Sequence, residues 1–406
     1  MARMINKKTT FIKSLLLASD TVIATTTYTP AEIAVIQASL LADNCRLAIV
    51  HGEHTKEFAA LWLRERSPNP DTLDPQTGQR LIEAAALPLD LRIEQADVED
   101  QTLHIRFSDG HRADFELDAL LQTPSSVAAK PLWDADLAEP PQADFAAALN
   151  DDDALLDMLE GLHHYGFVLV SDVPTTENGM QALIERVGPL RRTNWGGIAD
   201  VKAVANAYDL TMTQRGLEPH TDNPYRDPIP GYIWLQCLTN AAEGGDNTLV
   251  DGYRAAQLLR ERDPAAFECL TRVSPTFRYC DDNTHLESEG PLIELNSQGE
   301  PVRVRYSNRT ERVPALPAAE LEAYYAARQA FYELITGDEL TLHIKLDSGQ
   351  MLIMDNYRLF HGRRAYQLAG GVRHMRQGYV DRDSTASRRL VLRRQLSQTH
   401  QNEDVA

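Results

Sequence analysis

The stretch that decides how this chain folds and what it can bind is Glu218-Pro-His-Thr-Asp-Asn-Pro-Tyr-Arg226. In an extended segment, residues two apart point to the same side, so His220 and Asp222 can present an imidazole and a carboxylate to one metal ion. An isolated His-x-Asp triplet also arises by chance, and two ligands leave a metal site incomplete. The motif therefore needs a partner elsewhere in the chain.

That partner is predicted in Asp355-Asn-Tyr-Arg-Leu-Phe-His-Gly-Arg-Arg364, where His361 follows the short apolar strand Met351 to Met354. Two histidines and one carboxylate on one face of a metal leave open positions, which is the arrangement of non-haem Fe(II) oxygenases. Zinc hydrolases use the same ligand types, so the triad alone does not fix the metal.

An oxygenase that consumes a 2-oxo acid must also hold the far carboxylate of that acid, usually through an arginine beside a hydroxyl. Arg373, within Gly371-Val-Arg-His-Met-Arg376, lies one strand beyond His361 and is the candidate. Thr248, within Glu243-Gly-Gly-Asp-Asn-Thr-Leu-Val-Asp-Gly252, could add the hydroxyl, and Arg364 is a further candidate. The alternative is that these arginines are exposed to solvent and only balance the negative charge of the rest of the chain.

Composition excludes several classes of protein. The 406 residues are 43% hydrophobic and carry 40 Lys and Arg against 59 Asp and Glu, a net charge of −19. Such a charge argues against nonspecific binding to nucleic acid or to an anionic membrane. The four cysteines are too scattered to form a disulfide framework or a zinc motif. No apolar run is long enough for a transmembrane helix. Near the start of the chain, Ser19 and Asp20 interrupt an apolar stretch that is too short for a signal peptide. We therefore expect a cytoplasmic protein.

Hydrophobic patterning predicts two domains of mainly β structure with flanking helices. Short strands alternate with turns in the first part, and a Pro-rich stretch around Pro140 and Pro141 punctuates the chain. Strands outnumber helices beyond that point and lie far apart in sequence, which favours an antiparallel double-sheet barrel over a βαβ series. The expected boundaries are an extension over 1–30, a small β-rich domain over 31–125, a linker over 126–142 and a catalytic domain over 143–406. The expected strands are 46–50, 103–107, 166–170, 232–238, 248–250 and 351–354, and the expected helices are 151–165, 253–261 and 318–335.

Together, the motifs around His220, Gly244, His361 and Arg373 resemble the Fe(II)/2-oxoglutarate dioxygenases of the taurine dioxygenase superfamily. The γ-butyrobetaine and trimethyllysine hydroxylase branch is the more similar part, because Leu61-Trp-Leu-Arg-Glu-Arg66 resembles the start of its N-terminal domain. The resemblance implies a double-stranded β-helix (jelly roll), Fe(II) held by His220, Asp222 and His361, 2-oxoglutarate and O2 as co-substrates, and a homodimer. It also implies that 2-oxoglutarate is converted to succinate and CO2 while an unactivated C–H bond is hydroxylated.

The N-terminal domain departs from the branch, whose members bind a structural zinc through three cysteines and a histidine. Here the corresponding stretch reads Ser67-Pro-Asn-Pro-Asp-Thr72 without a cysteine, and His111 marks the histidine position. We therefore predict no zinc in this domain.

Substrate residues also follow from the resemblance. The branch holds a trimethylammonium group in an aromatic cage through cation–π attraction. Trp195, Tyr208 and Tyr379 match cage positions, while Arg191 stands where another ring is expected. At the opposite end of the substrate the branch receives a carboxylate with an asparagine, matched here by Asn308, which is followed by Arg309; Asn223 and Tyr225 add donors.

A phosphonate is bulkier than a carboxylate and can carry two charges, so it favours more donors and a guanidinium. The hypothesis is hydroxylation of 2-(trimethylammonio)ethylphosphonate next to phosphorus, with γ-butyrobetaine and trimethyllysine as rival substrates. From other classes, a non-catalytic small-molecule binding protein on the same scaffold and a zinc hydrolase remain alternatives at this stage.

Overall fold

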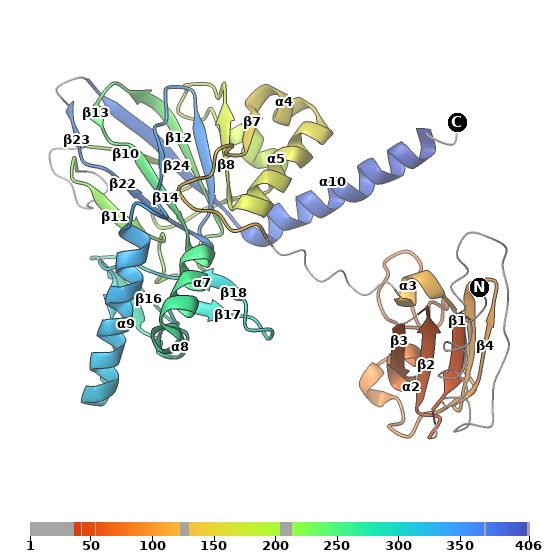
Figure 1. Cartoon of the computed structure of the whole chain (residues 1–406). Coiled ribbons are helices and arrows are strands. Elements are labelled where there is room, and N and C mark those ends of the chain that lie inside the picture. The colour runs from red at the N-terminus through yellow and green to blue at the C-terminus, as the bar shows by residue number, and fades with distance from the viewer. Residues whose placement is uncertain are drawn as a thin grey trace, which may run out of the picture. The chain divides into compact units, whose positions relative to one another are not determined.

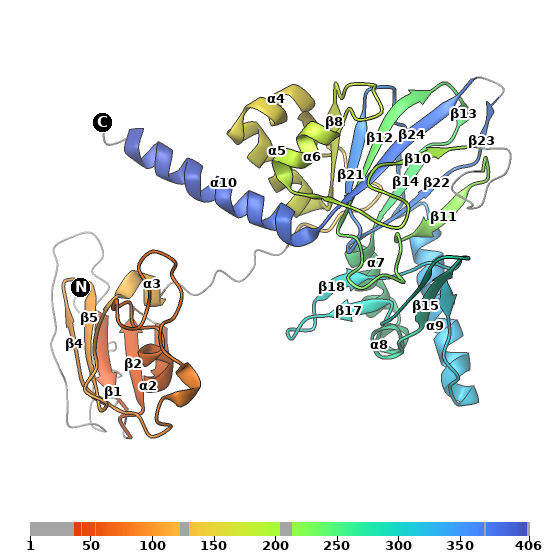
Figure 2. The same cartoon turned by 180° about the vertical axis from the view of Figure 1, so that it is seen from behind.

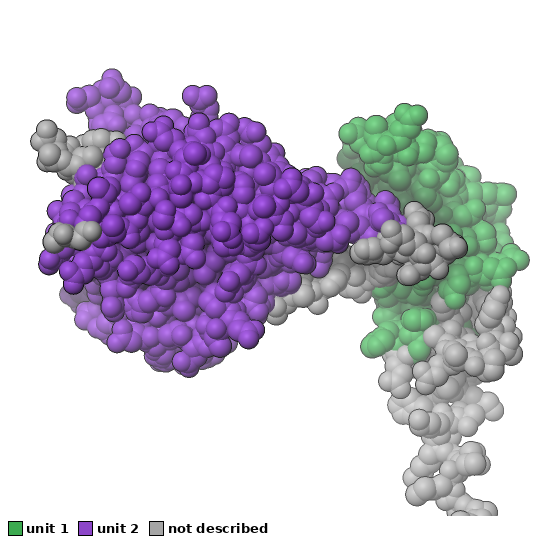
Figure 3. All heavy atoms as spheres, turned by 90° about the horizontal axis from the view of Figure 1, so that it is seen from above, with its two compact units in different colours: residues 1–129 green, residues 130–406 purple. Residues whose placement is uncertain are grey.

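The computed structural model describes residues 36–41, 43–52, 54–121, 130–203, 213–368 and 371–403, and the chain divides into two compact units between residues 129 and 130 (Figure 3). The expected extension, 1–30, lies outside the described residues. The division differs from the expected linker, because 130–142 belongs to the second unit. Trp133 is buried there against Phe167, with ring centroids 5.2 Å apart. The Pro-rich composition predicted a linker here and gave no sign of the buried Trp133 side chain.

The first unit consists of two antiparallel three-stranded sheets. One contains β1 (Ile36–Leu40), β2 (Arg46–His51) and β3 (His54–Ala59), and the other contains β4 (Ile93–Glu99), β5 (Thr102–Phe107) and β6 (Arg112–Glu116). Two short helices, α2 (Ala60–Arg64) and α3 (Leu117–Leu121), and a 3-10 turn, η1 (Ala84–Ala86), complete it. Alternate residues of both sheets, such as Leu47, Ile49, Leu103 and Phe107, share one hydrophobic core. The small β-rich domain was therefore predictable from the alternation.

A polar network occupies the place where the resemblance puts zinc ligands. Nε2 of His111 lies 2.8 Å from Oγ of the fully buried Ser67. Beside them, Nε of Arg64 donates to Asp109 over 2.8 Å and its Nη1 donates to Thr72 over 3.1 Å. These donors and acceptors satisfy one another, so ordinary hydrogen bonds hold the loop that follows α2.

The second unit is built on two mainly antiparallel sheets (Figures 1 and 2). The larger sheet contains β7 (Gln142–Asp144), β8 (Phe167–Ser171), β9 (Leu190–Arg191), β10 (Ala199–Lys202), β12 (Tyr232–Asn240), β21 (Met351–Asp355) and β24 (Arg373–Val380). Its order is β10-β24-β12-β21-β8-β7, with β9 beside β24, and only the terminal β7–β8 pair is parallel among these described strands. The smaller sheet contains β11 (Leu217–His220), β14 (Asn247–Asp251), β20 (Leu342–Ile344) and β22 (Leu359–Arg363), in the order β11-β22-β14-β20. The jelly-roll expectation is confirmed.

Both faces of the large sheet are covered, which explains why β12 is an almost continuous apolar run. Tyr232 and Trp234 pack on one face with Leu159 of α5 (Asp152–Tyr165), in a layer that also includes α4 (Phe145–Asn150) and α6 (Gln181–Val187). Ile233 and Leu235 face the smaller sheet instead. Helix α5 matches its predicted position and begins where the Asp151 side chain accepts a hydrogen bond from the backbone of Ala154, 2.8 Å away.

A long insertion between β14 and β20 extends from one end of the two sheets (Figure 1). It contains α7 (Gly252–Arg262), α8 (Pro264–Arg272), β15 (Thr276–Cys280), β16 (His285–Glu289), β17 (Ile293–Leu295), β18 (Pro301–Val304), β19 (Glu311–Arg312) and α9 (Ala318–Thr336). Two short strands, β13 (Glu243–Gly244) and β23 (Tyr366–Gln367), pair with each other, and α10 (Arg382–Glu403) ends the described chain. Within the described ranges, no helix combines the length and the apolar character needed to cross a membrane.

Candidate metal centre and active site

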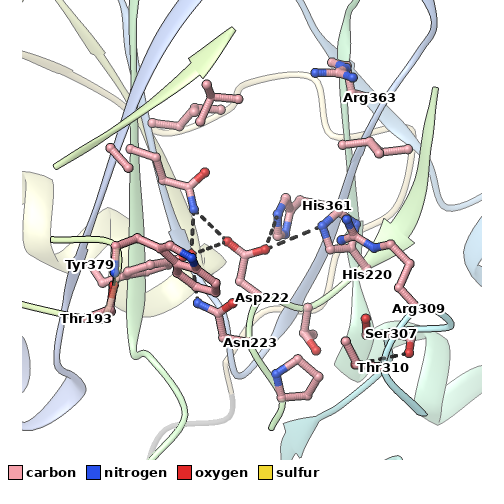
Figure 4. A pocket seen from close by; sticks show the side chains of 18 of the residues that line it. Thr193, His220, Asp222, Asn223, Ser307, Arg309, Thr310, His361, Arg363 and Tyr379 are labelled. Atoms are coloured by element: carbon pink, nitrogen blue, oxygen red, sulfur yellow. Dashed lines mark hydrogen bonds and ion pairs between the residues drawn. The ribbon is translucent and has the colours of Figure 1, made fainter. Parts of the chain in front are cut away.

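Neighbouring strands of the smaller sheet bring the two histidine motifs together. β11 pairs antiparallel with β22, and His220 stands directly opposite His361. Their ring centroids are 4.4 Å apart. Asp222 follows β11, and its Oδ1 lies 3.5 Å from Nε2 of His220 and 3.6 Å from Nε2 of His361. Figure 4 shows these three side chains converging in the cavity, as a three-ligand metal site requires.

The backbone and carboxylate of Asp222 are both held in place. Its backbone N–H donates to the side chain of Asn356 over 2.7 Å, and that side chain donates back to the Asp222 carbonyl over 3.0 Å. Oδ2 accepts hydrogen bonds from Gln377 and Tyr379 of β24, at 2.7 and 2.8 Å. The other oxygen, Oδ1, is thereby directed at the histidines, as an outer shell around a metal ligand does.

The tautomer of His220 follows from its backbone contact. Nδ1 lies 2.9 Å from the carbonyl oxygen of Glu218, which can only accept a hydrogen bond, so Nδ1 carries the proton. The lone pair of Nε2 is then available to a metal. Nδ1 of His361 is buried and has no hydrogen-bond partner among the described residues.

Electrostatics favour acceptor forms of Asp222 and His220. Burial alone would raise the pKa of the Asp222 carboxyl, but attraction to His361 and His220 holds that pKa well below its usual value. Burial and the adjacent His361 lower the pKa of His220 to about 4. Burial beside the Asp222 carboxylate raises the pKa of the Tyr379 hydroxyl. A carboxylate beside a neutral imidazole is the protonation state that a divalent cation needs.

Arg373 fits the expected role of anion anchor. It is buried at the start of β24, and its Nε and Nη1 have no hydrogen-bond partner within the described ranges. A buried guanidinium with two unpaired nitrogen donors is costly unless an anion completes it, and a carboxylate matches its fork of donors. Arg373 lines the same cavity as the triad. A 2-oxo acid therefore fits the residues present.

Strand alternation separates the other anchor candidates. Arg363 shares the face of His361, is buried and lines the cavity, whereas Arg364 points the other way and is exposed. Thr248 stands opposite Gly362 on the neighbouring strand and does not line the cavity, while Asn247, opposite Arg363, does. The structure thus brings Arg363 and Asn247 to the cavity in place of Arg364 and Thr248, because the side-chain period of a strand is two residues.

Most of the expected substrate residues line this cavity. They are Trp195, Asn223, Tyr225, Arg309 and Tyr379. Asn308 does not line it, because its side chain is exposed and its Oδ1 accepts a hydrogen bond from Arg328 over 3.1 Å. Arg191 is engaged elsewhere, in an ion pair of 2.8 Å with Asp381. Tyr208 lies outside the described residues.

The sequence motifs missed several lining residues. Tyr279 of β15 lies 5.2 Å from Trp195 and 5.3 Å from Tyr225, measured between ring centroids, so three aromatic rings form one cluster at the cavity. Ser307 and Thr310 flank Arg309 in the chain, and Gln377 precedes Tyr379 by two residues on the same strand face. Ser307, Thr310 and Gln377 could have been identified because each lies within two residues of a predicted site residue in the sequence. Tyr279 has no predicted site residue near it in the sequence.

The cavity has two chemically different sides. Figure 4 shows Tyr379 and Thr193 on one side of Asp222, and Arg309, Ser307 and Thr310 on the other. The charge of Arg309 contributes to lowering the pKa of His220, which places the guanidinium within electrostatic reach of the triad.

Comparison with known proteins identifies the family. A family model described as taurine catabolism dioxygenase TauD, TfdA family matches residues 128–379, and one described as γ-butyrobetaine hydroxylase-like, N-terminal, matches residues 28–121. The γ-butyrobetaine dioxygenase of Pseudomonas sp. (strain AK-1) is 31% identical over 348 residues, which cover 83% of this chain and 91% of that protein. The human γ-butyrobetaine dioxygenase is 28% identical, covering 89% and 98%, and the rat mitochondrial trimethyllysine dioxygenase is 27% identical, covering 85% of each chain. The chain therefore belongs to the taurine catabolism dioxygenase TauD/TfdA family and is an iron- and 2-oxoglutarate-dependent dioxygenase.

Proposed function

We propose that this dioxygenase hydroxylates an unactivated C–H bond in a small molecule with a trimethylammonium group at one end and an anionic group at the other. The observation that carries the proposal is the cavity itself, which is lined by the metal triad, by the three rings of the aromatic cluster and by Arg309. The relatives named for γ-butyrobetaine and trimethyllysine support the trimethylammonium end. The family also favours this reaction over a non-catalytic binding protein or a zinc hydrolase.

Each group in the cavity has a defined task in this reaction. His220, Asp222 and His361 hold Fe(II), and Arg373 binds the far carboxylate of 2-oxoglutarate. When bound, Fe(II) and 2-oxoglutarate would supply, together with O2, the oxidising power for hydroxylation, with succinate and CO2 as the other products. The aromatic cluster orients the substrate by cation–π attraction and Arg309 fixes its anionic end, so that one C–H bond faces the metal.

The best candidate substrate is 2-(trimethylammonio)ethylphosphonate, hydroxylated next to phosphorus. Arg309 lines the cavity between two hydroxyl-bearing residues, Ser307 and Thr310. A guanidinium with neighbouring hydroxyls suits three phosphonate oxygens better than two carboxylate oxygens. Asn223 and Tyr225 support the anion less than expected, because the Tyr225 hydroxyl donates to Asn223 over 2.6 Å and Asn223 donates to Tyr379 over 3.1 Å. γ-Butyrobetaine is the competing substrate, favoured by the identity to the Pseudomonas enzyme.

The decisive experiment offers three substrates in parallel. Protein loaded anaerobically with Fe(II) is mixed with 2-oxoglutarate, O2 and either the phosphonate, γ-butyrobetaine or trimethyllysine, while succinate and the hydroxylated product are followed by mass spectrometry. We expect the phosphonate to be hydroxylated with the highest kcat/KM. A preference for γ-butyrobetaine would mean that the natural substrate carries a carboxylate. If none of the three compounds is hydroxylated or stimulates succinate formation, the trimethylammonium proposal is overturned.

A variant pair tests the anion assignment. Arg309→Ala should lower kcat/KM for the phosphonate by about 10- to 1000-fold, the scale of a lost charge-assisted hydrogen bond and an unpaired anion. Arg364→Ala removes an exposed arginine that does not line the cavity and is the matched control. Equal kinetics in Arg309→Ala and wild type would remove Arg309 from the substrate site.

We further propose that the enzyme works in the cytoplasm as a homodimer. The four cysteines are all free in the structure, two of them buried, which suits a reducing compartment. The homodimer follows from the family resemblance, and light scattering of the purified chain tests it.

A further inference from the structure

The loop that carries Arg309 is fixed at both ends. At its start, the backbone carbonyl of Tyr306 accepts a hydrogen bond from the backbone of Thr221 over 2.8 Å, and the backbone N–H of Tyr306 donates to Thr221 Oγ1 over 3.1 Å. Thr221 lies between the metal ligands His220 and Asp222. The start of the loop is therefore fixed relative to the metal site.

The end of the loop is fixed by helix α9. The buried Glu311 carboxylate accepts a hydrogen bond from the hydroxyl of the fully buried Tyr324, 2.7 Å away. Nε of Arg328 donates to both oxygens of the same carboxylate, at 3.1 and 3.0 Å. Burial alone would lower the pKa of Arg328, but the Glu311 carboxylate raises it. A buried carboxylate with this many partners is a rigid point of attachment.

Arg328 also reaches the middle of the loop. Its Nη2 donates to Oδ1 of Asn308 over 3.1 Å, and its guanidinium carbon lies 5.1 Å from the ring centroid of Tyr306. One planar guanidinium thus contacts the loop at three positions, two before Arg309 and one after it. A lysine could keep the charge beside Glu311, but it could not reproduce this fork.

We propose that Arg328 is a positioning residue for the anion-binding side of the cavity, acting through Glu311 and Asn308 to hold Arg309 at the distance that the substrate anion requires. The inference rests on the proposed function. It also assigns Asn308 a different task from the one expected, because the amide supports the loop from outside the cavity. Placing a charged group to within a fraction of an ångström requires such support from residues that do not touch the ligand.

The test uses variants of the full-length iron-loaded enzyme and the phosphonate substrate. Arg328→Lys keeps a positive charge near Glu311, so the enzyme should fold, but it loses the contact with Asn308. We expect KM for the phosphonate to rise about tenfold, the value of one charge-assisted hydrogen bond, with kcat and the KM for 2-oxoglutarate nearly unchanged. Arg262→Lys is the matched control, since Arg262 donates to both oxygens of Glu339 on an exposed surface.

Double variants separate positioning from general stability. If Arg328 acts through Arg309, then Arg328→Lys should add little to the loss already caused by Arg309→Ala. Asn308→Ala, at an exposed position, provides the same test should Arg328→Lys not fold, and its effect should likewise vanish in the Arg309→Ala background.

Two results would overturn the inference while leaving the proposed function intact. One is an unchanged KM in a folded Arg328→Lys enzyme, and the other is losses that multiply in the double variants. A wild-type enzyme that hydroxylates no trimethylammonium substrate would overturn the proposed function, and this inference with it.

Discussion

Two buried histidine sites, one in each unit, use similar residues and differ in what completes them. In the first unit, His111 meets a serine hydroxyl at 2.8 Å, and the arginine, threonine and carboxylate around it pair with one another. In the second unit, His220, Asp222 and His361 direct ligand atoms at one point, all within 4.8 Å of each other. The first site mixes donors with acceptors, whereas the second gathers acceptors, so the second suits a cation, and for the first the absence of zinc stays a prediction.

The largest effect is expected at the acceptor site. Asp222→Ala removes the carboxylate that lies between the two histidines, so Fe(II) binding and hydroxylation should fall by more than the roughly 100-fold that loss of an outer-shell partner costs at metal sites. Iron content after gel filtration and succinate formation measure this. Asp109→Ala, which removes the carboxylate bonded to Arg64 in the first unit, should retain full iron content. Equal iron in both variants would contradict the difference drawn between the sites.

A smaller loss of Fe(II) affinity is expected when the Asp222 carboxylate is kept but one of its hydrogen bonds is removed. Tyr379→Phe deletes one of the two hydrogen bonds to Asp222 Oδ2, so Fe(II) affinity should fall about 10- to 100-fold. Isothermal titration of the metal-free protein with Fe(II) under anaerobic conditions checks it. Tyr253→Phe removes a hydroxyl that donates to the carbonyl of Val302, away from the metal site, and should leave the affinity unchanged. An unaltered affinity in Tyr379→Phe would mean that Gln377 alone orients Asp222.

In the first unit, the corresponding change should affect stability alone. Ser67→Ala leaves Nε2 of the partly buried His111 without its partner and should destabilise this unit by about 1 to 3 kcal/mol. Hydrogen exchange of peptides from β5 and β6 reports the loss. Thr55→Ala, at an exposed position of β3 where the hydroxyl makes no hydrogen bond within the described residues, is the control. A chelator should leave exchange at these wild-type peptides unchanged, and faster exchange around Ser67 after chelation would reveal a metal that the hydrogen bonds do not predict.

The smallest effect is a pH dependence of the first unit. Burial and the nearby Arg64 lower the pKa of His111 below its ordinary value of 6.5. The unfolded chain then binds more protons than the folded one just below pH 6.5, so stability is full above that pH and declines as the pH falls further. Hydrogen exchange between pH 7 and 5, corrected for the intrinsic rate, measures the decline, and His111→Gln should abolish it. The same decline in His111→Gln would assign it to another group.

Local sequence patterns predicted the elements well where burial is regular. β12 and β21 are apolar because both faces of the large sheet are covered. Helix α5 begins after an aspartate cap and ends just before Gly166, whose φ of 81° suits a glycine. The segment around Trp133 shows the opposite case. Its attachment to the second unit depends on a ring contact with Phe167, which composition does not report.

The candidate site was predictable as a set of residue types and less so as a set of positions. His220, Asp222, His361 and Arg373 do meet in one cavity. The choice between Arg363 and Arg364, or between Asn247 and Thr248, depends on strand register, and a shift of one residue reverses the direction of a side chain. Asn308 was expected at the substrate because it matches the asparagine that the family branch uses for a carboxylate, yet its partner is Arg328 on a helix that no motif connects to it.

By itself, the sequence determined which chemistry is available: two histidines and a carboxylate in strand-like motifs, an arginine one strand later, and a first domain without cysteine ligands at the expected place. The tertiary structure decided which of these groups face one another. Register placed His220 opposite His361, the insertion between β14 and β20 brought Tyr279 and Arg309 to the cavity, and α9 fixed the loop that carries Arg309. The physical reason is that metal binding and anion binding depend on atoms a few ångströms apart, and residues distant in sequence reach that separation only through packing.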